Sequence, residues 1–163
     1  AGVYDIGEDY DDIIGSLEGR FAASQTLKFS LGYERGYRTS FVGNYVRCDR
    51  GYATGDLMIG GAFLLMAELH GGLYSYGVPR TGEGVSYSTS ADPREDIRLG
   101  GSLSGEYRFT DWLAMTGSFR YETNLTDYEY EFQQTSTDAE EPIPPDPAAY
   151  DKVEAWLGMR VFY

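Results

Sequence analysis

Long stretches of strict two-residue alternation are the feature that most limits what this chain can fold into. In residues 97–109, apolar residues and glycines at odd positions, from Ile97 to Phe109, alternate with polar residues at even positions. Residues 113–125 and 27–38 repeat the pattern. A period of two indicates a β-strand with two chemically different faces, and it does not fit a helical period. The chain is therefore predicted to be all-β.

Seven segments follow this alternation. They cover about residues 13–24, 27–39, 52–65, 66–78, 96–109, 113–126 and 152–163. Strands of soluble globular proteins usually have ~5–6 residues, whereas a tilted membrane-spanning strand needs ~9–11. The length of these segments therefore predicts an antiparallel transmembrane β-barrel with about seven strands in this chain.

One side of the alternating segments is apolar and rich in glycine, and its aromatic residues lie near the segment ends. This placement suits the aromatic girdles found where a barrel crosses the membrane–water interface. The predicted interface aromatics are Phe109, Trp112, Tyr121 and Tyr163.

The other side of the segments carries acids and bases interleaved with glycine, serine and threonine. It could be the solvent face of a soluble sandwich, but the length of the strands favours the lumen wall of a barrel, where charges are hydrated and paired across strands. The predicted lumen-lining residues are Glu18, Arg20, Lys28, Glu34, Asp56, Glu68, His70, Arg98, Glu106, Arg108, Arg120, Glu122, Glu154 and Arg160. Arg38 has the same parity.

The formal net charge of −13 has an uneven distribution along the chain. Residues 1–12 and 127–151 hold half of the 26 acids and none of the 13 bases, so the rest of the chain is neutral. Strong acidity argues against a nucleic-acid partner, which would require a basic stripe. With one Cys and one His, the composition also predicts no metal site and no cofactor.

The connections between segments alternate in length. Tight turns are predicted at 24–26, 65–66 and 110–112, and long polar loops at 40–51, 79–95 and 127–151. Outer-membrane barrels have short periplasmic turns and long external loops. We therefore expect extracellular long loops, an acidic external segment at residues 1–12 and a periplasmic C-terminus. Cys48 is expected to lie in an external loop.

The segment Val153–Tyr163 alternates and ends on an aromatic residue. It resembles the C-terminal signature strand of Gram-negative outer-membrane proteins, which the barrel-assembly machinery recognises. The residues that carry this predicted assembly signal are Leu157, Met159, Val161 and Tyr163. The sequences of Leu27–Tyr33 and Tyr107–Met115 resemble strands of the porin-2 type of outer-membrane β-barrel. The resemblance implies integral insertion among outer-membrane lipids and passive or secretory transport, and it supplies no catalytic residue.

An odd number of strands has a consequence for closure. Single-chain bacterial barrels contain an even number of strands, with both termini in the periplasm. Seven strands would instead place Ile13 at the external end. The sequence therefore predicts the C-terminal portion of a larger barrel, completed by upstream strands of the same protein or by another chain.

These residues point to three possible functions. The favoured one is a porin-like, water-filled channel for the passive passage of small solutes. The alternative is a structural or secretion component of an envelope complex, for polysaccharide or protein export or surface anchoring. A hydrolase using His70 and Glu68 with Ser75 or Ser102 is disfavoured, because Ser75 has the wrong parity and no Gly-x-Ser-x-Gly motif is present. No enzymatic activity and no catalytic residue are predicted.

Overall fold

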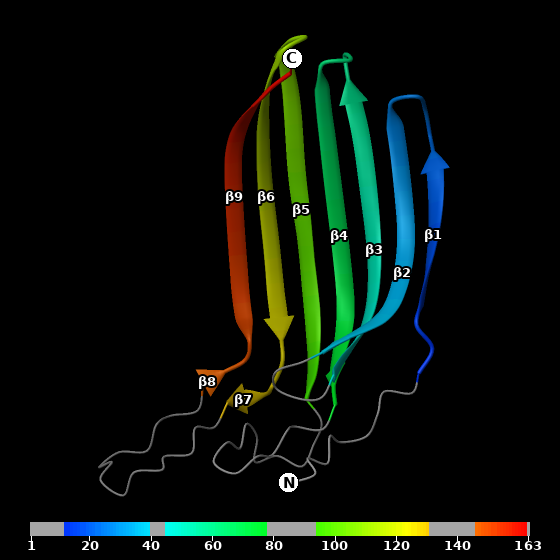
Figure 1. Cartoon of the computed structure of the whole chain (residues 1–163), viewed down its shortest axis with the longest axis vertical. Helices are drawn as coiled ribbons and strands as arrows, with labels where there is room; N and C mark the ends of the chain where they lie inside the picture. The colour runs from blue at the N-terminus through cyan, green and yellow to red at the C-terminus, as the bar shows by residue number, and fades with distance from the viewer. Residues whose placement is uncertain (1–11, 40–44, 78–93, 131–145, 163) are drawn as a thin grey trace, which may run out of the picture.

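A computed structural model of the chain describes residues 12–39, 45–77, 94–130 and 146–162. It contains a seven-stranded antiparallel sheet with the strand order β1-β2-β3-β4-β5-β6-β9 (Figure 1). The strands are β1 (Gly15–Ala22), β2 (Leu27–Thr39), β3 (Tyr45–Ile59), β4 (Phe63–Tyr76), β5 (Glu95–Thr110), β6 (Leu113–Leu125) and β9 (Tyr150–Val161). A small separate ladder joins β7 (Glu129–Tyr130) to β8 (Asp146–Pro147). The prediction of an all-β antiparallel fold is confirmed.

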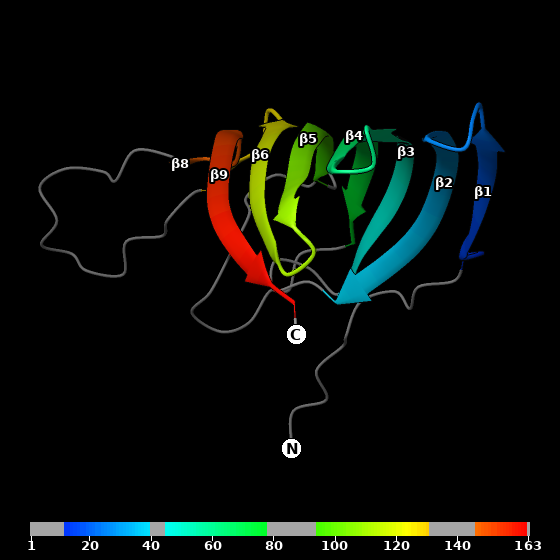
Figure 2. The same cartoon turned by 90° about the horizontal axis from the view of Figure 1, so that it is seen from above.

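The sheet is curved and open (Figure 2). β1 and β9 lie at its two edges, and among the described residues each pairs with one neighbour, β2 and β6 respectively. Because all six pairings are antiparallel, the two edge strands run in the same direction. The seven strands therefore do not close into a barrel by themselves. In the described part of the chain, no helix is long and apolar enough to cross a membrane.

The turn between β3 and β4 differs from the prediction. The chain reverses at residues 60–62 and not at 65–66, so the predicted strands 52–65 and 66–78 had wrong boundaries. Gly60 and Gly61 adopt positive φ angles of 59° and 72°, which glycine tolerates because it lacks a Cβ. Apolar residues on both sides of this turn hid the break in alternation, although a Gly-Gly pair is itself a hairpin signal.

The start of β3 is a second correction. The long loop predicted at 40–51 is wrong for residues 45–51, which form the first half of β3 and pair with β2. In the structure, residues 40–44 and 78–93 lie outside the described part of the chain, as do 131–145 of the third predicted loop. The end of the sheet where β3, β5 and β9 begin is called the loop end below, and the opposite end the turn end.

The two faces of the sheet have the reverse of the usual polarity. One face, which carries Leu31, Leu69 and Leu157, is called the outer face; these three side chains are 70%, 70% and 78% exposed. The opposite face, called the polar face, carries Asp96 and Asn124, which are 0% and 1% exposed. Soluble proteins bury apolar side chains and expose charged ones. This sheet covers charged side chains and presents a broad apolar surface.

Candidate functional site

The strand register places every predicted lumen-lining residue on the polar face. Directly opposed residues of antiparallel strands lie on the same face, so the assignment passes from each strand to the next. These residues are Glu18 and Arg20 on β1, Lys28 and Glu34 on β2, Asp56 on β3, Glu68 and His70 on β4, Arg98, Glu106 and Arg108 on β5, Arg120 and Glu122 on β6, and Glu154 and Arg160 on β9. The sequence therefore predicted their common face; that they line a lumen remains a prediction.

A cavity of about 370 Å³ lies on the polar face and is called the central hollow. Side chains from five strands, β2 to β6, line it: Glu34, Arg38, Arg50, Glu68, His70, Tyr74, Arg98, Ser102, Arg120 and Glu122. One hollow lined by five adjacent strands indicates that the polar face is the inner side of the curved sheet seen in Figure 2.

Arg50 connects the acids of the central hollow across three strands. Its Nη2 donates to Glu68 Oε1 at 2.5 Å, and its Nη1 donates to Glu34 Oε1 at 3.3 Å. His70 Nδ1 lies 3.2 Å from the same oxygen of Glu68. Arg50 was missed in the sequence because residues 40–51 were assigned to a loop. Arg50 lies two residues before Tyr52 and therefore has the same parity, and this continuation of the alternation was the signal that could have identified it.

A second polar group lies at the loop end of the polar face, around the fully buried carboxylate of Asp96. Arg94 donates to both oxygens of Asp96, from Nε at 2.8 Å and from Nη2 at 2.7 Å. Asn124 Nδ2 and Tyr76 OH each donate to Oδ2 at 3.2 Å. Such a set of donors offsets the cost of removing a carboxylate from water. Asn124 Nδ2 also donates to the carbonyl of Ala148 at 3.0 Å, which fixes the segment preceding β9.

Arg98 lies between the Asp96 group and the central hollow. Its Nη2 donates to Tyr76 OH at 2.8 Å and lies 3.4 Å from Asp96 Oδ2. The guanidinium lies over the ring of Tyr74, 4.3 Å from the centroid, in a cation–π contact. The sequence predicted Arg98 on this face but not the Asp96 group, because an acid at the first positions of a strand resembles an ordinary loop residue.

Two glycines allow rings to lie along the polar face. The Tyr52 ring covers Gly32, where a Cβ would come within 2.3 Å of it, and Tyr52 OH donates to Glu18 Oε2 at 2.6 Å. His70 covers Gly100, where a Cβ would lie 2.7 Å from Nε2. With a larger residue at either position, the ring would have to rise from the sheet into the space above it.

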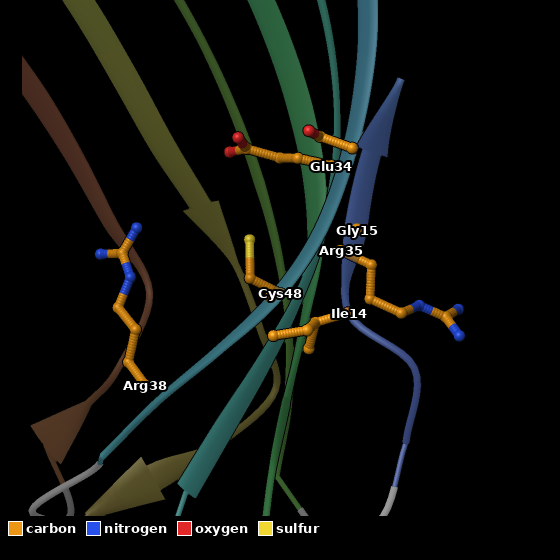
Figure 3. Close-up of a pocket in the computed structure, with 8 residues that line it drawn as sticks. Ile14, Gly15, Glu34, Arg35, Arg38 and Cys48 are labelled. Carbon is orange, nitrogen blue, oxygen red and sulfur yellow. The ribbon is translucent and has the colours of Figure 1, made fainter.

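Cys48 is buried on the polar face of β3, 7% exposed, so its prediction as an external loop residue was wrong. The physical reason is the early start of β3 at Tyr45. Cys48 borders a cavity of about 470 Å³ between β1, β2 and β3 at the loop end. Figure 3 shows Glu34, Arg38 and Cys48 extending to one side of β2, and Arg35 extending to the other side.

The outer face is apolar along most of its length, with aromatic residues near both ends. Phe109 and Trp112 are exposed at the turn end, and Tyr121 is exposed nearer the loop end. Tyr121 OH donates to Asp151 at 2.6 Å, and Tyr33 OH donates to Asp49. The predicted aromatic positions thus lie on the surface, with the exception of Tyr163, which lies outside the described residues.

Charged residues reappear on the outer face beyond these tyrosines. Arg35 Nε donates to Asp49 Oδ1 at 2.5 Å, and Arg47 Nε lies 3.3 Å from Asp49 Oδ2. Asp12, from the predicted acidic external segment, lies 3.5 Å from both arginines. The rest of that segment, residues 1–11, lies outside the described part. The residues predicted to carry the assembly signal, Leu157, Met159 and Val161, are exposed on the outer face of β9.

The residues weighed for a hydrolase are divided between the two faces. Ser75 pairs with Arg47 and Glu95 on the outer face, away from His70, whereas Ser102 lies opposite Glu68 and lines the central hollow with Glu68 and His70. Among the described residues, no group of three or more His, Cys, Asp or Glu side chains could hold a metal ion.

No family model, curated protein or solved structure matches this chain.

Proposed function

We propose that this chain forms part of the wall of an outer-membrane β-barrel, a porin-like, water-filled channel for the passive passage of small solutes. The observation that carries the proposal is the inverted polarity of the sheet. Exposed leucines on the outer face suit contact with lipid, and the charged residues of the polar face suit a hydrated lumen. A solvent-exposed sandwich would require the opposite distribution.

The strand length supports the same proposal. β2 and β6 each have 13 residues. At ~3.3 Å per residue this is about 43 Å along the strand, and a tilt of ~40° reduces it to a height of about 33 Å. The hydrocarbon core of a bilayer is ~30 Å thick. Strands β2 to β6, with 13 to 16 residues, are therefore long enough to cross it and to extend slightly on both sides, whereas β1, with eight residues, is shorter than a crossing strand.

The ends of the apolar surface support the proposal as well. Tyrosines that donate to carboxylates, Tyr33 and Tyr121, separate the leucine-rich part of the outer face from the charged loop end. Such amphipathic rings prefer the headgroup level of a membrane. Together with the short turns and long loops expected of outer-membrane barrels, this supports a loop end outside the cell and a turn end, with the end of β9, in the periplasm.

The open edges determine what else the barrel needs. Backbone groups without partners are very costly in hydrocarbon, so β1 and β9 require neighbouring strands. Because both edge strands run in the same direction, a fully antiparallel closure adds an odd number of strands. These strands would come from the same protein or from another chain. A second chain in the wall would favour the alternative role, a structural or secretion component of an envelope complex.

Single-cysteine labelling in membranes tests which face meets lipid. In a Cys48→Ser background, we expect Leu69→Cys to be protected from a water-soluble maleimide and Ser102→Cys to react. In a soluble protein Leu69→Cys would react as well, because Leu69 is 70% exposed. Rapid labelling of Leu69→Cys in intact membranes would contradict the proposal.

Planar-bilayer recording of the full-length protein tests the channel itself. We expect discrete conductance steps that scale with salt concentration, as for a water-filled pore. Correctly inserted protein that carries no current would reject the channel and leave the structural or secretion role.

A further inference from the structure

We propose that the central hollow is an anion-binding site, which makes the channel select small anionic solutes, inorganic or organic, through the guanidinium groups of Arg38, Arg98 and Arg120. This inference rests on the proposed channel function and adds the class of solute.

The acids and the arginines of the hollow differ in how many hydrogen-bond partners they have within the sheet. Four arginines and three glutamates line it. Glu34 and Glu68 both accept from Arg50, and Glu122 accepts from Tyr150 OH at 2.5 Å. The acids of the hollow therefore each have a donor from the wall, which reduces their capacity to attract a passing cation.

The guanidinium groups of Arg38, Arg98 and Arg120 have N–H donors without an acceptor in the described part of the chain. Within the described residues, Arg38 has no hydrogen bond and no ion pair. Arg120 has one distant carboxylate, with its Nη1 3.8 Å from Glu154 Oε2. Arg98 Nε is buried and has no acceptor in the described part of the chain. Guanidinium groups bind carboxylate and phosphate oxygens with paired N–H donors, so these three arginines can bind an anion.

These donors face one shared space. Arg38 comes from β2, Arg98 from β5 and Arg120 from β6, and all three line the same hollow of about 370 Å³. This volume lies within the range of ~300–1,000 Å³ typical of small-molecule sites. Figure 3 shows Arg38 extending to the same side of β2 as Glu34, toward the polar face. A small anion in the hollow can thus meet donors from both sides.

Glycine keeps this space open. His70 lies flat over Gly100, and Arg98 is held over the Tyr74 ring. Both side chains are thereby fixed along the wall, so the hollow is not filled by the groups that line it.

Local charge outweighs the acidity of the whole chain at this point. The chain carries −13, but half of its acids fall in residues 1–12 and 127–151, and all of these except Asp151 precede or connect the seven strands of the sheet. A solute inside the hollow responds first to the groups that line it. Among these the four arginines outnumber the three glutamates, and low-dielectric walls concentrate their field.

Reversal potentials across planar bilayers test the inference on the full-length protein in a tenfold KCl gradient. We expect a chloride-to-potassium permeability ratio above one for the unmodified protein. The double variant Arg38→Gln/Arg120→Gln should lower the ratio to about one or below, and adding Arg98→Gln should lower it further. Millimolar inorganic phosphate should reduce the chloride current of the unmodified protein and not that of the variants.

The matched control is Arg35→Gln, because Arg35 extends to the other side of β2 from Arg38 (Figure 3), lies outside the hollow and is paired with Asp49. Its permeability ratio should equal that of the unmodified protein. The double variant avoids the buried Asp96 group, so it folds even if the triple variant does not. Absence of any current would reject the channel, whereas current with cation preference, or a ratio unchanged in the double variant, would reject anion selection alone.

Discussion

The outer face and the polar face of the same sheet are stabilised in different ways. On the outer face, leucines such as Leu31 and Leu69 remain exposed within the described chain, so their stabilisation comes from whatever surrounds the sheet. On the polar face, Asp96 and Asn124 are buried and hydrogen-bonded by neighbouring strands. The difference teaches that this wall holds itself together through its polar side and depends on its environment through its apolar side.

The most disruptive change should be removal of the buried Asp96 carboxylate at the loop end of the polar face. Asp96→Ala leaves Arg94 buried without its bidentate acceptor, and breaking a buried pair costs about 3–5 kcal/mol. We expect this loss in the free energy of unfolding by urea, measured on protein in vesicles. Asp56→Ala is the control, since Asp56 has no ion pair in the described part of the chain, and it should change little. An equal loss in the free energy of unfolding for both variants would show that the buried Asp96 group does not stabilise the sheet more than an unpaired acid does.

A charge on the outer face should have the next largest effect. Leu69→Arg places a cation near the middle of β4, and arginine facing lipid at the bilayer midplane costs about 2–4 kcal/mol. Unfolding in vesicles should show this destabilisation. Ser102→Arg, on the polar face, should cost much less because water reaches it. If Leu69→Arg were no more destabilising than Ser102→Arg, the claim that the two faces meet different environments would be wrong.

Overpacking at a glycine should have a smaller effect and should depend on the face. In Gly100→Ala the new Cβ would lie 2.7 Å from His70 Nε2 and 3.0 Å from the Tyr121 carbonyl oxygen. We expect about 1–3 kcal/mol of destabilisation, as for other crowded sites. Gly117→Ala, where the nearest atoms are 3.9 Å away, is the matched outer-face control. Thermal unfolding that shifts equally in both would show that the His70 contact is unimportant.

The smallest effect is expected at an exposed charge of the hollow. Arg120→Gln removes a distant pair with Glu154, and exposed pairs contribute little to stability. The free energy of unfolding should stay unchanged within error while the permeability ratio falls. A clear loss of stability would mean that Arg120 holds the wall together instead of contacting solute.

Much of the fold follows from the sequence because alternation records the two environments of each strand directly. It predicted the face of Glu68 and of Arg120, and the common exposure of Phe109 and Trp112. It failed where both faces are apolar, which displaced the β3–β4 turn from 60–62 to 65–66.

The details of the candidate site were less predictable, because they depend on contacts between strands. Asp96 has no local feature that separates it from a loop acid, and only pairing with Arg94 and Asn124 explains its burial. Arg50 likewise depends on the register that places Glu34 directly opposite it, and on a diagonal reach to Glu68, which is opposite Thr54. The alternation within one strand predicts which face of the sheet a residue lies on, but it does not predict which residues of neighbouring strands it contacts.

The unequal edges of the sheet have a mechanical consequence. The β1–β2 seam joins eight residue pairs, whereas the β6–β9 seam joins twelve and is pinned at its start by the Asn124–Ala148 hydrogen bond. Under lateral tension, the shorter seam parts first. Of the two edge strands, β1 is therefore the one that can be displaced or exchanged more easily.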